Sequence, residues 1–355
     1  MSFITKRKNT RQIHVGDVKV GGLAPITVQS MTNTYTQDVA ATVSQINRLE
    51  QAGCELVRVA VPDQKAAASI TSIKQEISIP LIADIHFDYR LAISSAKAGA
   101  DGLRINPGNI GSVKKVKAIV DCAKSFNIPI RIGVNAGSLE KDILKKHDGA
   151  SAEAMVESAL RHIELLSSFG FYEIKISIKS SDVCRTIDAY RLLSPKTELP
   201  LHVGITEAGG LYSGIVKSSI GIGMLLTEGI GDTIRVSLTR DPVEEVRVGF
   251  DILKALNIRR HGPEIISCPT CGRCKINLFD IVERVEKALL LNPVPIKLAI
   301  MGCIVNGPGE AKEADIGVAG GDGTGILFKK GEVIKKFPEE KLVDVLLKEI
   351  ENWKE

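Results

Sequence analysis

The feature that most constrains the fold of this chain is an alternation of short apolar runs with helical patterns, which occurs eight times. The runs begin near residues 26, 55, 79, 101, 128, 173, 199 and 231. Their average spacing of about 29 residues accommodates a strand, two short loops and a helix that leads to the next parallel strand. The repeat predicts an α/β fold, a TIM (β/α)8 barrel. An open doubly wound sheet is the alternative, but no GxGxxG motif follows the first run, which favours the closed barrel.

Two segments add to the barrel repeat. Residues 10–22 alternate apolar and polar side chains around Gly16-Asp17, which predicts a β-hairpin that closes one end of the barrel. The fifth unit contains extra polar residues at 138–156, which predicts a long loop with a small helix on the active-site side.

A second domain is expected after the basic Gly/Pro stretch at 259–263, so that residues 1–260 form the barrel and 264–355 form a small α+β domain. The order predicted for the second domain is a strand, a cysteine-rich loop, a helix, four strands and a closing amphipathic helix. Residues 320–325, with the sequence GGDGTG, link two strand patterns and do not open a helix. They therefore predict a hairpin turn, because a phosphate loop would lead into a helix N-terminus.

Composition and charge exclude several classes of function. The formal net charge is only +4, and 9 Phe, 5 Tyr and 1 Trp are too few for base-stacking platforms, which disfavours a nucleic-acid partner. The N-terminus has no apolar signal-peptide core, and no stretch approaches the roughly 18 apolar residues that a membrane helix needs. We therefore expect a cytoplasmic protein with no membrane partner.

Cationic residues interrupt the predicted strands, although parallel strands buried on both faces are normally apolar. These residues are Arg58, Arg104, Arg131, Lys175, Lys179 and Arg235. Such a charge costs several kcal/mol unless it is paired. A strand's period of two directs them into the barrel, towards the C-terminal mouth, where Asp84, Glu55 and Glu207 are the available carboxylates. Any single arginine is readily explained by an ion pair, but the surplus of cations predicts a phosphorylated ligand.

Four of the seven cysteines lie close together near the C-terminus, namely Cys268, Cys271, Cys274 and Cys303. A tight CxxC with a distant cysteine is typical of iron–sulfur ligand sets. Zinc is an alternative, but a zinc ribbon needs a second CxxC or HxxxH some 15 to 20 residues further on, and none follows. Free or buried thiols are the third possibility.

The complete pattern resembles the 4-hydroxy-3-methylbut-2-en-1-yl diphosphate synthase family over the whole chain. The most specific segments are SCPTC (267–271), GCIVNGPGEA (302–311), INPGNIG (105–111), RIGVNAGSL (131–139) and VGITEAG (203–209). The resemblance implies a two-electron reductive ring opening and dehydration of 2-C-methyl-D-erythritol 2,4-cyclodiphosphate, in isoprenoid precursor biosynthesis. It also implies reduced ferredoxin or flavodoxin as the electron donor.

The resemblance further implies roles for individual residues. A 4Fe-4S cluster would be held by Cys268, Cys271, Cys303 and Glu310. Cys274 departs from the family pattern, and spacing alone would name it as the fourth ligand instead of Glu310. The diphosphate would be bound by Arg58, Arg104, Arg131, Lys179 and Ser237. Asn135, Thr206 and Glu207 would lie near the reacting carbons, with Glu207 as the proton donor to the departing hydroxyl. Three further residues either bind substrate or belong to the barrel core, namely Asp84, His86 and Arg235.

Two other functions remain open at this point: a pterin-dependent methyltransferase-like barrel, and a non-catalytic iron–sulfur electron carrier. The domain order also predicts an assembly. The linker at 259–263 spans at most about 18 Å, and it follows the eighth helix, which ends on the barrel face opposite the mouth. We therefore expect a head-to-tail homodimer in which each cluster domain caps the partner's barrel.

Overall fold

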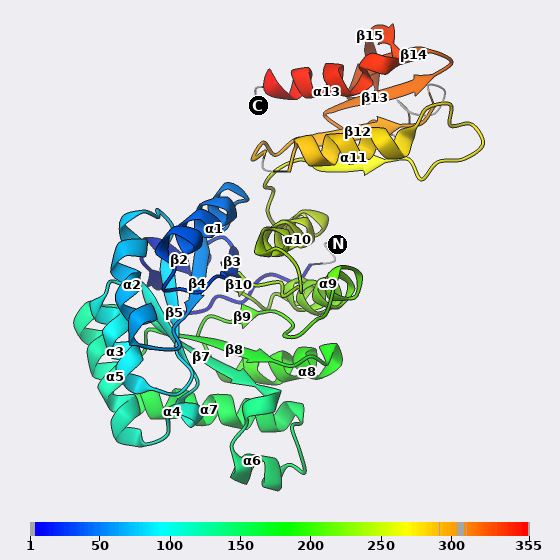
Figure 1. Cartoon of the computed structure of the whole chain (residues 1–355). Helices are drawn as coiled ribbons and strands as arrows, with labels where there is room; N and C mark the ends of the chain where they lie inside the picture. The colour runs from blue at the N-terminus through cyan, green and yellow to red at the C-terminus, as the bar shows by residue number, and fades with distance from the viewer. Residues whose placement is uncertain (1–3, 291, 304–308, 310, 354–355) are drawn as a thin grey trace. The chain divides into compact units, whose positions relative to one another are not determined.

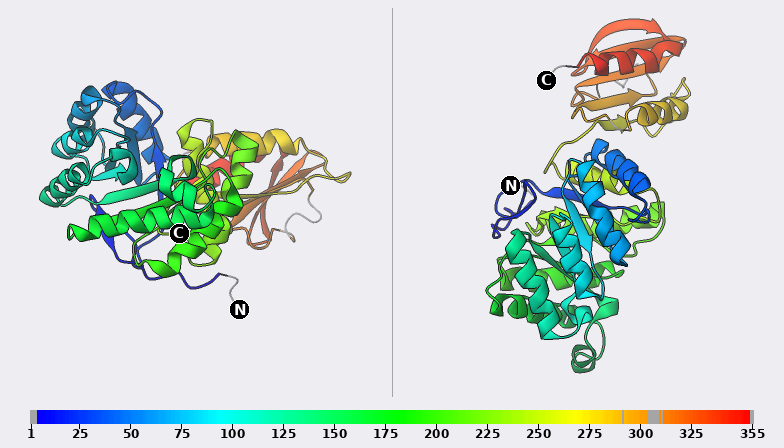
Figure 2. Two further views of the ribbon diagram at one scale, coloured as in Figure 1. Left: turned by 90° about the horizontal axis from the view of Figure 1, so that it is seen from below. Right: turned by 60° about the vertical axis from the view of Figure 1, so that its left-hand side comes forward.

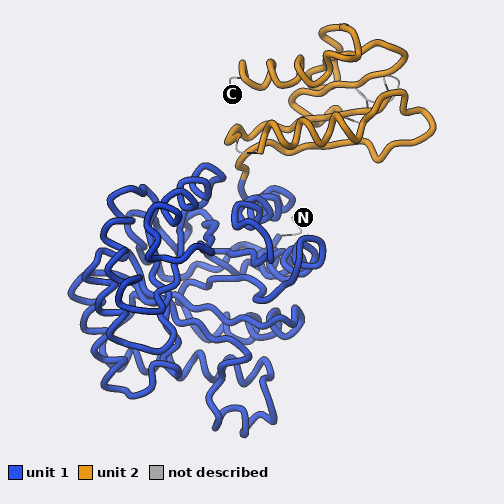
Figure 3. Tube along the Cα trace, viewed as in Figure 1, with its two compact units in different colours: residues 1–259 blue, residues 260–355 orange. Residues whose placement is uncertain are grey.

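A computed structural model describes residues 4–353 except 291, 304–308 and 310. The chain divides into two compact units between Arg259 and Arg260 (Figure 3). No helix among the described residues is long and apolar enough to cross a membrane.

The first unit is a barrel of eight parallel strands (Figure 1). The strands are β3 (Thr27–Met31), β4 (Leu56–Ala60), β5 (Leu81–Asp84), β6 (Gly102–Ile105), β7 (Ile130–Asn135), β8 (Ile174–Lys179), β9 (His202–Val203) and β10 (Thr233–Ile234). Their order is β8-β7-β6-β5-β4-β3-β10-β9, and a parallel bridge between Ile176 and Leu201 closes β8 against the start of β9. The predicted TIM barrel is confirmed.

Helices surround the strands (Figure 2). They are α1 (Val39–Gln51), α2 (Gln64–Gln75), α3 (Tyr89–Lys97), α4 (Pro107–Ile110), α5 (Val113–Phe126), α7 (Ala152–Ser168), α8 (Val183–Leu193), α9 (Leu211–Thr227) and α10 (Pro242–Ala255). Several begin at an aspartate whose carboxylate accepts a backbone N–H of the first turn, as Asp38, Asp63 and Asp182 do. Their apolar faces are buried against the strands, for example at Ile46 and Leu49 of α1.

The predicted hairpin consists of β1 (Ile13–Val15) and β2 (Val18–Val20). Its three buried side chains, Ile13, Val15 and Val20, pack against Leu56 and Ile82. These two residues lie at the beginnings of β4 and β5, so the hairpin closes the N-terminal end of the barrel, as predicted.

The insertion after β7 forms a 3-10 turn, η1 (Ala136–Ser138), and a short helix, α6 (Lys141–Lys146). Glu140 fastens it to α7, because its carboxylate accepts a hydrogen bond from Ser158 at 2.7 Å and lies 3.2 Å from His162 Nε2. The insertion is shorter than expected, since residues 152–156 already belong to α7.

The second unit is a five-stranded sheet of β11 (Glu264–Ser267), β12 (Lys297–Met301), β13 (Ile316–Gly321), β14 (Thr324–Lys329) and β15 (Glu332–Pro338). The first three strands are parallel and the last two join antiparallel. Two helices, α11 (Leu278–Ala288) and α13 (Leu342–Glu351), form one core with the sheet, and η3 (Glu339–Lys341) precedes α13. The GGDGTG segment is the β13–β14 turn, with positive φ at Asp322 and Gly323, so the predicted hairpin is confirmed.

Candidate active site in the barrel and cysteine site in the second unit

Four charged residues form a continuous row across the inner face of the barrel. Asp84, Arg104, Arg131 and Lys175 are successive Cα partners on β5, β6, β7 and β8. Residues paired in register present their side chains to the same face of a sheet. All four side chains are buried. Arg104, Arg131 and Lys175 therefore share one face of the sheet, as the period of two predicts.

Asp84 neutralises part of this charge. Its carboxylate lies 3.5 Å from Arg58 Nε and 3.1 Å from Arg104 Nη1. Burial by itself would raise the pKa of Asp84, but the two guanidinium groups outweigh it and hold the pKa at about 2. His86 Nε2 is 3.8 Å from the same carboxylate, but its side chain is mostly exposed at the rim. Asp84 is thus an internal partner of the cations, as expected.

The second internal carboxylate is Glu245 of α10, which the sequence analysis missed. It is buried, and its Oε2 lies 3.5 Å from Arg235 Nη2 while Oε1 accepts the backbone N–H of Leu238 at 3.0 Å. The helical spacing of buried residues in α10 places Glu245 on the inner face, and this signal was available.

The expected partners Glu55 and Glu207 do not fill this role. Glu55 pairs at 2.9 Å with Arg259 and accepts the N–H of Val28, at the start of the strands. Glu207 is exposed. The prediction that these two carboxylates balance the inward cations is wrong, because neither carboxylate is buried among them.

Of the buried barrel cations, three have no carboxylate partner in the described part of the chain, namely Arg131, Lys175 and Lys179. Burial, reinforced by neighbouring cations, lowers the pKa of Arg131 and Lys179 well below their ordinary values. Burial likewise lowers the pKa of Arg58 to about 10, although Asp84 partly opposes it. Unpaired buried cations are costly, so a cluster of this kind favours the binding of an anion.

Two glycines make room for the cationic side chains. A Cβ atom at Gly133 would lie 2.5 Å from Arg104 Nε, and one at Gly204 would lie 2.7 Å from Lys179 Nζ. A side chain at Gly133 would displace the Arg104 guanidinium, and one at Gly204 would meet the backbone oxygen of Arg235 as well as Lys179. The barrel interior is therefore shaped around the cations as well as lined by them.

The remaining predicted site residues lie at the C-terminal ends of the strands. Asn135 ends β7 and is the Cα partner of Lys179, Thr206 and Glu207 follow β9, and Ser237 follows β10. Glu207 has a positive φ of 53°, a conformation uncommon for a residue with a side chain. The barrel places all of these residues at its C-terminal rim, but among the described residues no side-chain hydrogen bond joins Asn135, Thr206 or Glu207 to the cations.

The second unit brings its cysteines to one end of the sheet. Cys268 follows β11, Cys303 follows β12, and these two strands are parallel neighbours. The Cys268 N–H donates to Ile300 O, and a Cβ at Gly302 would lie 2.6 Å from Cys274 Sγ. All seven cysteines are free, and Cys271 is exposed. Glu310 lies outside the described residues, and within them no three His, Cys, Asp or Glu side chains form a metal-binding group.

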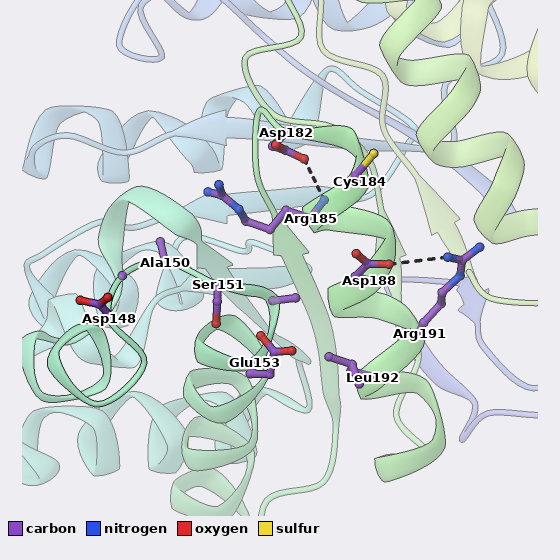
Figure 4. Close-up of a pocket in the computed structure, with 12 residues that line it drawn as sticks. Asp148, Ala150, Ser151, Glu153, Asp182, Cys184, Arg185, Asp188, Arg191 and Leu192 are labelled. Carbon is purple, nitrogen blue, oxygen red and sulfur yellow. Dashed lines mark hydrogen bonds and ion pairs between the residues drawn. The ribbon is translucent and has the colours of Figure 1, made fainter.

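A separate pocket of about 810 Å³ opens outside the barrel interior, between the start of α7 and helix α8 (Figure 4). Its lining includes Cys184 and Arg185, with Asp182 accepting the Arg185 backbone N–H at 2.8 Å. Asp188 lies 3.6 Å from Arg191 at its edge. None of the predicted site residues lines this pocket, and its Arg191 is already paired with Asp188 and Glu228.

Both units match models of one protein family. Residues 10–250 match the GcpE TIM-barrel domain, and residues 264–352 match the GcpE protein C-terminal domain.

Curated relatives are similar over nearly the whole chain. The sequence is 61% identical to 4-hydroxy-3-methylbut-2-en-1-yl diphosphate synthase (flavodoxin) of Caldanaerobacter subterraneus over 349 residues, which cover 98% of both chains. It is 58% identical to the Geobacter sulfurreducens protein of the same name, covering 97% of this chain and 98% of the relative.

Solved structures add a likeness in fold alone. Dihydropteroate synthase from Stenotrophomonas maltophilia superposes with a TM-score of 0.52 at 13% identity, over 70% of this chain and 97% of that one. This likeness concerns the barrel architecture and does not favour a pterin-dependent activity. The electron-carrier alternative has no support either, because both units match the same enzyme family. By its full-length similarity, the chain belongs to the 4-hydroxy-3-methylbut-2-en-1-yl diphosphate synthase family.

Proposed function

We propose that this protein is a cytoplasmic enzyme that reductively opens and dehydrates 2-C-methyl-D-erythritol 2,4-cyclodiphosphate to 4-hydroxy-3-methylbut-2-enyl diphosphate. The observation that carries the proposal is the surplus of buried cations inside the barrel of a chain that belongs to this family. A cyclic diphosphate supplies the anionic oxygens that these cations lack.

The diphosphate would bind in the barrel. Guanidinium groups donate in a planar fork that matches phosphate oxygens, and lysine adds a point charge. The proposed ligands are Arg58, Arg104, Arg131, Lys179 and Ser237, with Asp84, His86 and Arg235 as their neighbours. Because Asp84 and Glu245 already hold Arg58, Arg104 and Arg235 in place, those side chains are preorganised before the substrate arrives.

The reacting carbons would lie above the diphosphate, at the C-terminal rim. Asn135 and Thr206 would orient the substrate there, and Glu207 would donate the proton with which the hydroxyl leaves as water. Glu207 has a positive φ, and this backbone conformation defines the position from which its side chain leaves the loop. The exposed carboxyl of Glu207 would be enclosed once the site is covered.

The second unit would hold a 4Fe-4S cluster through Cys268, Cys271, Cys303 and Glu310. Thiolates are the usual ligands of such clusters, and the first and third of these cysteines follow neighbouring parallel strands. When bound, the cluster would supply the two electrons, delivered by reduced flavodoxin or ferredoxin. Cys274, whose sulfur lies against Gly302, would pack beside the site without binding iron.

We further propose the head-to-tail homodimer. The first unit exposes an apolar stripe along α9, in which Tyr212, Val216, Ile220 and Met224 recur every four residues and are each 40% exposed or more. A helix that is apolar on both its inner and outer faces is normally covered. We assign this surface to a second copy of the chain, because a two-fold interface brings the same patch of both subunits together.

The activity is tested on protein purified and reconstituted anaerobically. We expect the cyclodiphosphate to be consumed under a viologen reductant, with 4-hydroxy-3-methylbut-2-enyl diphosphate as product. The Glu207→Gln protein, which should keep its cluster, is the matched control for background reduction. A protein with a complete cluster that leaves the cyclodiphosphate intact would contradict the proposal.

A further inference from the structure

Lys175 is a buried lysine to which the family resemblance gives no role. It is the second residue of β8, and only 2% of it is exposed. Its Nζ makes no hydrogen bond with any described residue. A buried amine without a partner is costly whether it is charged or neutral, so its retention calls for a ligand.

The neighbours of Lys175 also have nitrogen atoms without hydrogen-bond partners. Arg131 is its Cα partner on β7, and the Nε and Nη1 atoms of Arg131 have no partner among the described residues. On the other side, His202 Nδ1 is 2.6 Å from Thr233 Oγ1, while His202 Nε2 is unpartnered. Three buried nitrogen-bearing groups on β7, β8 and β9 therefore have free hydrogen-bonding atoms.

The carboxylate that attracts the Lys175 ammonium is Asp232, but it is engaged elsewhere. Its Oδ1 accepts from Thr10 at 3.0 Å, and its Oδ2 accepts the backbone N–H of Leu201 at 2.8 Å. The other charged group that faces Lys175, besides Arg131, is Arg58 from β4. The local balance of charge is therefore positive, and Asp232 gives the Lys175 ammonium no hydrogen bond.

We propose that Lys175 is a further anion-binding residue, which forms the deep end of the barrel's anion site with Arg131 and binds an oxyanion of the diphosphate. The proposal rests on the proposed function, since it concerns the same site. The oxyanion would accept hydrogen bonds from Lys175 Nζ and from the free nitrogens of Arg131. This arrangement would extend the site one strand beyond the pair that Arg104 and Arg131 form on β6 and β7.

Binding should then be coupled to proton uptake. Burial, with the Arg131 charge, lowers the pKa of Lys175 to about 7. At pH 8 the empty site would hold mostly the neutral amine, and a bound oxyanion would raise the pKa again. The amine would take its proton from the solvent, so about one proton would be absorbed at Lys175 for each anion bound.

The test is calorimetric titration of the full-length holoenzyme with inorganic pyrophosphate at pH 8, in two buffers of different ionisation enthalpy. We expect Lys175→Met to bind pyrophosphate about 10- to 100-fold more weakly, as for loss of one charged hydrogen bond. The proton uptake should fall by about one relative to the wild-type protein. If Lys175→Met fails to fold, Lys175→Gln takes its place with the same expected result. Lys114→Met removes an exposed lysine and should change neither the pyrophosphate affinity nor the proton uptake.

Three outcomes bear on the proposal separately from the reaction. Unchanged affinity and proton uptake in the Lys175 variants would overturn it, and would indicate that internal water satisfies the amine. Absence of pyrophosphate binding by the wild-type protein would overturn it too. If the variants lose affinity as expected while the wild-type protein does not consume the cyclodiphosphate, Lys175 is an anion ligand and only the proposed reaction is wrong.

Discussion

The barrel and the second unit present their proposed functional groups in different ways. In the barrel, the cations lie on strands, where the register fixes them, and ion pairs to Asp84 and Glu245 hold three of the arginines. In the second unit, the cysteines lie on loops beyond the strands, and the described ones are not gathered into a metal-binding group. The proposed anion site is thus formed by the fold itself, whereas the proposed cysteine site would be completed by the group that it binds.

The largest effect that this comparison predicts is in the second unit. Cys303→Ser should abolish cluster binding and activity, because a site that is assembled around its cluster needs each of its thiolate ligands. The wild-type protein should be brown under anaerobic conditions and contain about four irons per chain. Iron content and visible absorption measure this outcome directly. Stoichiometric zinc without visible absorption would show that the metal assignment is wrong.

Cys274→Ser is the matched control, since it changes a neighbouring thiol by the same substitution. We expect it to leave the iron content nearly unchanged, because Cys274 is assigned to packing against Gly302. If Cys274→Ser destroys the cluster while Glu310→Ala preserves it, then Cys274 is the fourth ligand.

The next prediction joins the two regions across the dimer. Glu207→Gln and Cys303→Ser chains should each be inactive alone, but a heterodimer should regain one intact composite site. Activity per verified heterodimer should therefore approach about half of the wild-type value in this two-site arrangement. Full turnover by a protein that remains monomeric would rule out the arrangement.

Ile220→Lys, on the exposed stripe of α9, should weaken the dimer in sedimentation measurements.

A smaller effect is expected when one barrel cation is removed. Arg131→Met should weaken substrate binding by about 10- to 100-fold. Thermal stability should stay the same or rise, because Arg131 is buried among cations and has no carboxylate partner in the described part of the chain. Binding titrations and thermal unfolding of the same samples check both statements.

Arg104→Met sharpens this prediction, since Arg104 is ion-paired and Arg131 is not. It should weaken binding by a similar factor but also lower stability, because Asp84 would keep only the more distant contacts with Arg58 and His86. Loss of stability in Arg131→Met with unchanged affinity would show that the barrel arginines are purely structural.

The two regions also differ in what could be predicted from sequence. A strand's period of two determines which side chains face inward, so the row from Asp84 to Lys175 was predictable once the barrel was recognised. Partners from outside the strands were not found: Glu245 comes from a helix, and Glu55 pairs at the opposite end with Arg259. Register within a sheet is a local property, whereas these pairings depend on how helices and linkers pack.

In the second unit, the cysteine spacing predicted the type of ligand but not its geometry. The strands, the GGDGTG turn and the closing amphipathic helix followed from local patterns, and that helix buries Leu342, Leu346 and Ile350. The positions of Cys271 and Cys303 depend on loops, where no periodicity restricts the backbone. A loop site of this kind is defined by its bound group, and the amino-acid sequence does not contain that group.

The last prediction concerns stability and pH, and it tests whether the barrel holds an uncompensated amine. Burial lowers the pKa of Lys175 from its ordinary value of 10.5 to about 7. Between these values the unfolded chain binds more protons than the native one, so this residue makes the free energy of unfolding rise with pH. Its contribution is at most about 1.4 kcal/mol per pH unit. Lys175→Met should flatten that rise in urea unfolding series between pH 7 and 10 and be the more stable protein at pH 7, while Lys114→Met should follow the wild-type curve. An unchanged slope in Lys175→Met would mean that the amine is already compensated in the empty barrel. Lys175, the most deeply buried cation, would then no longer support the view that the fold itself forms an anion site.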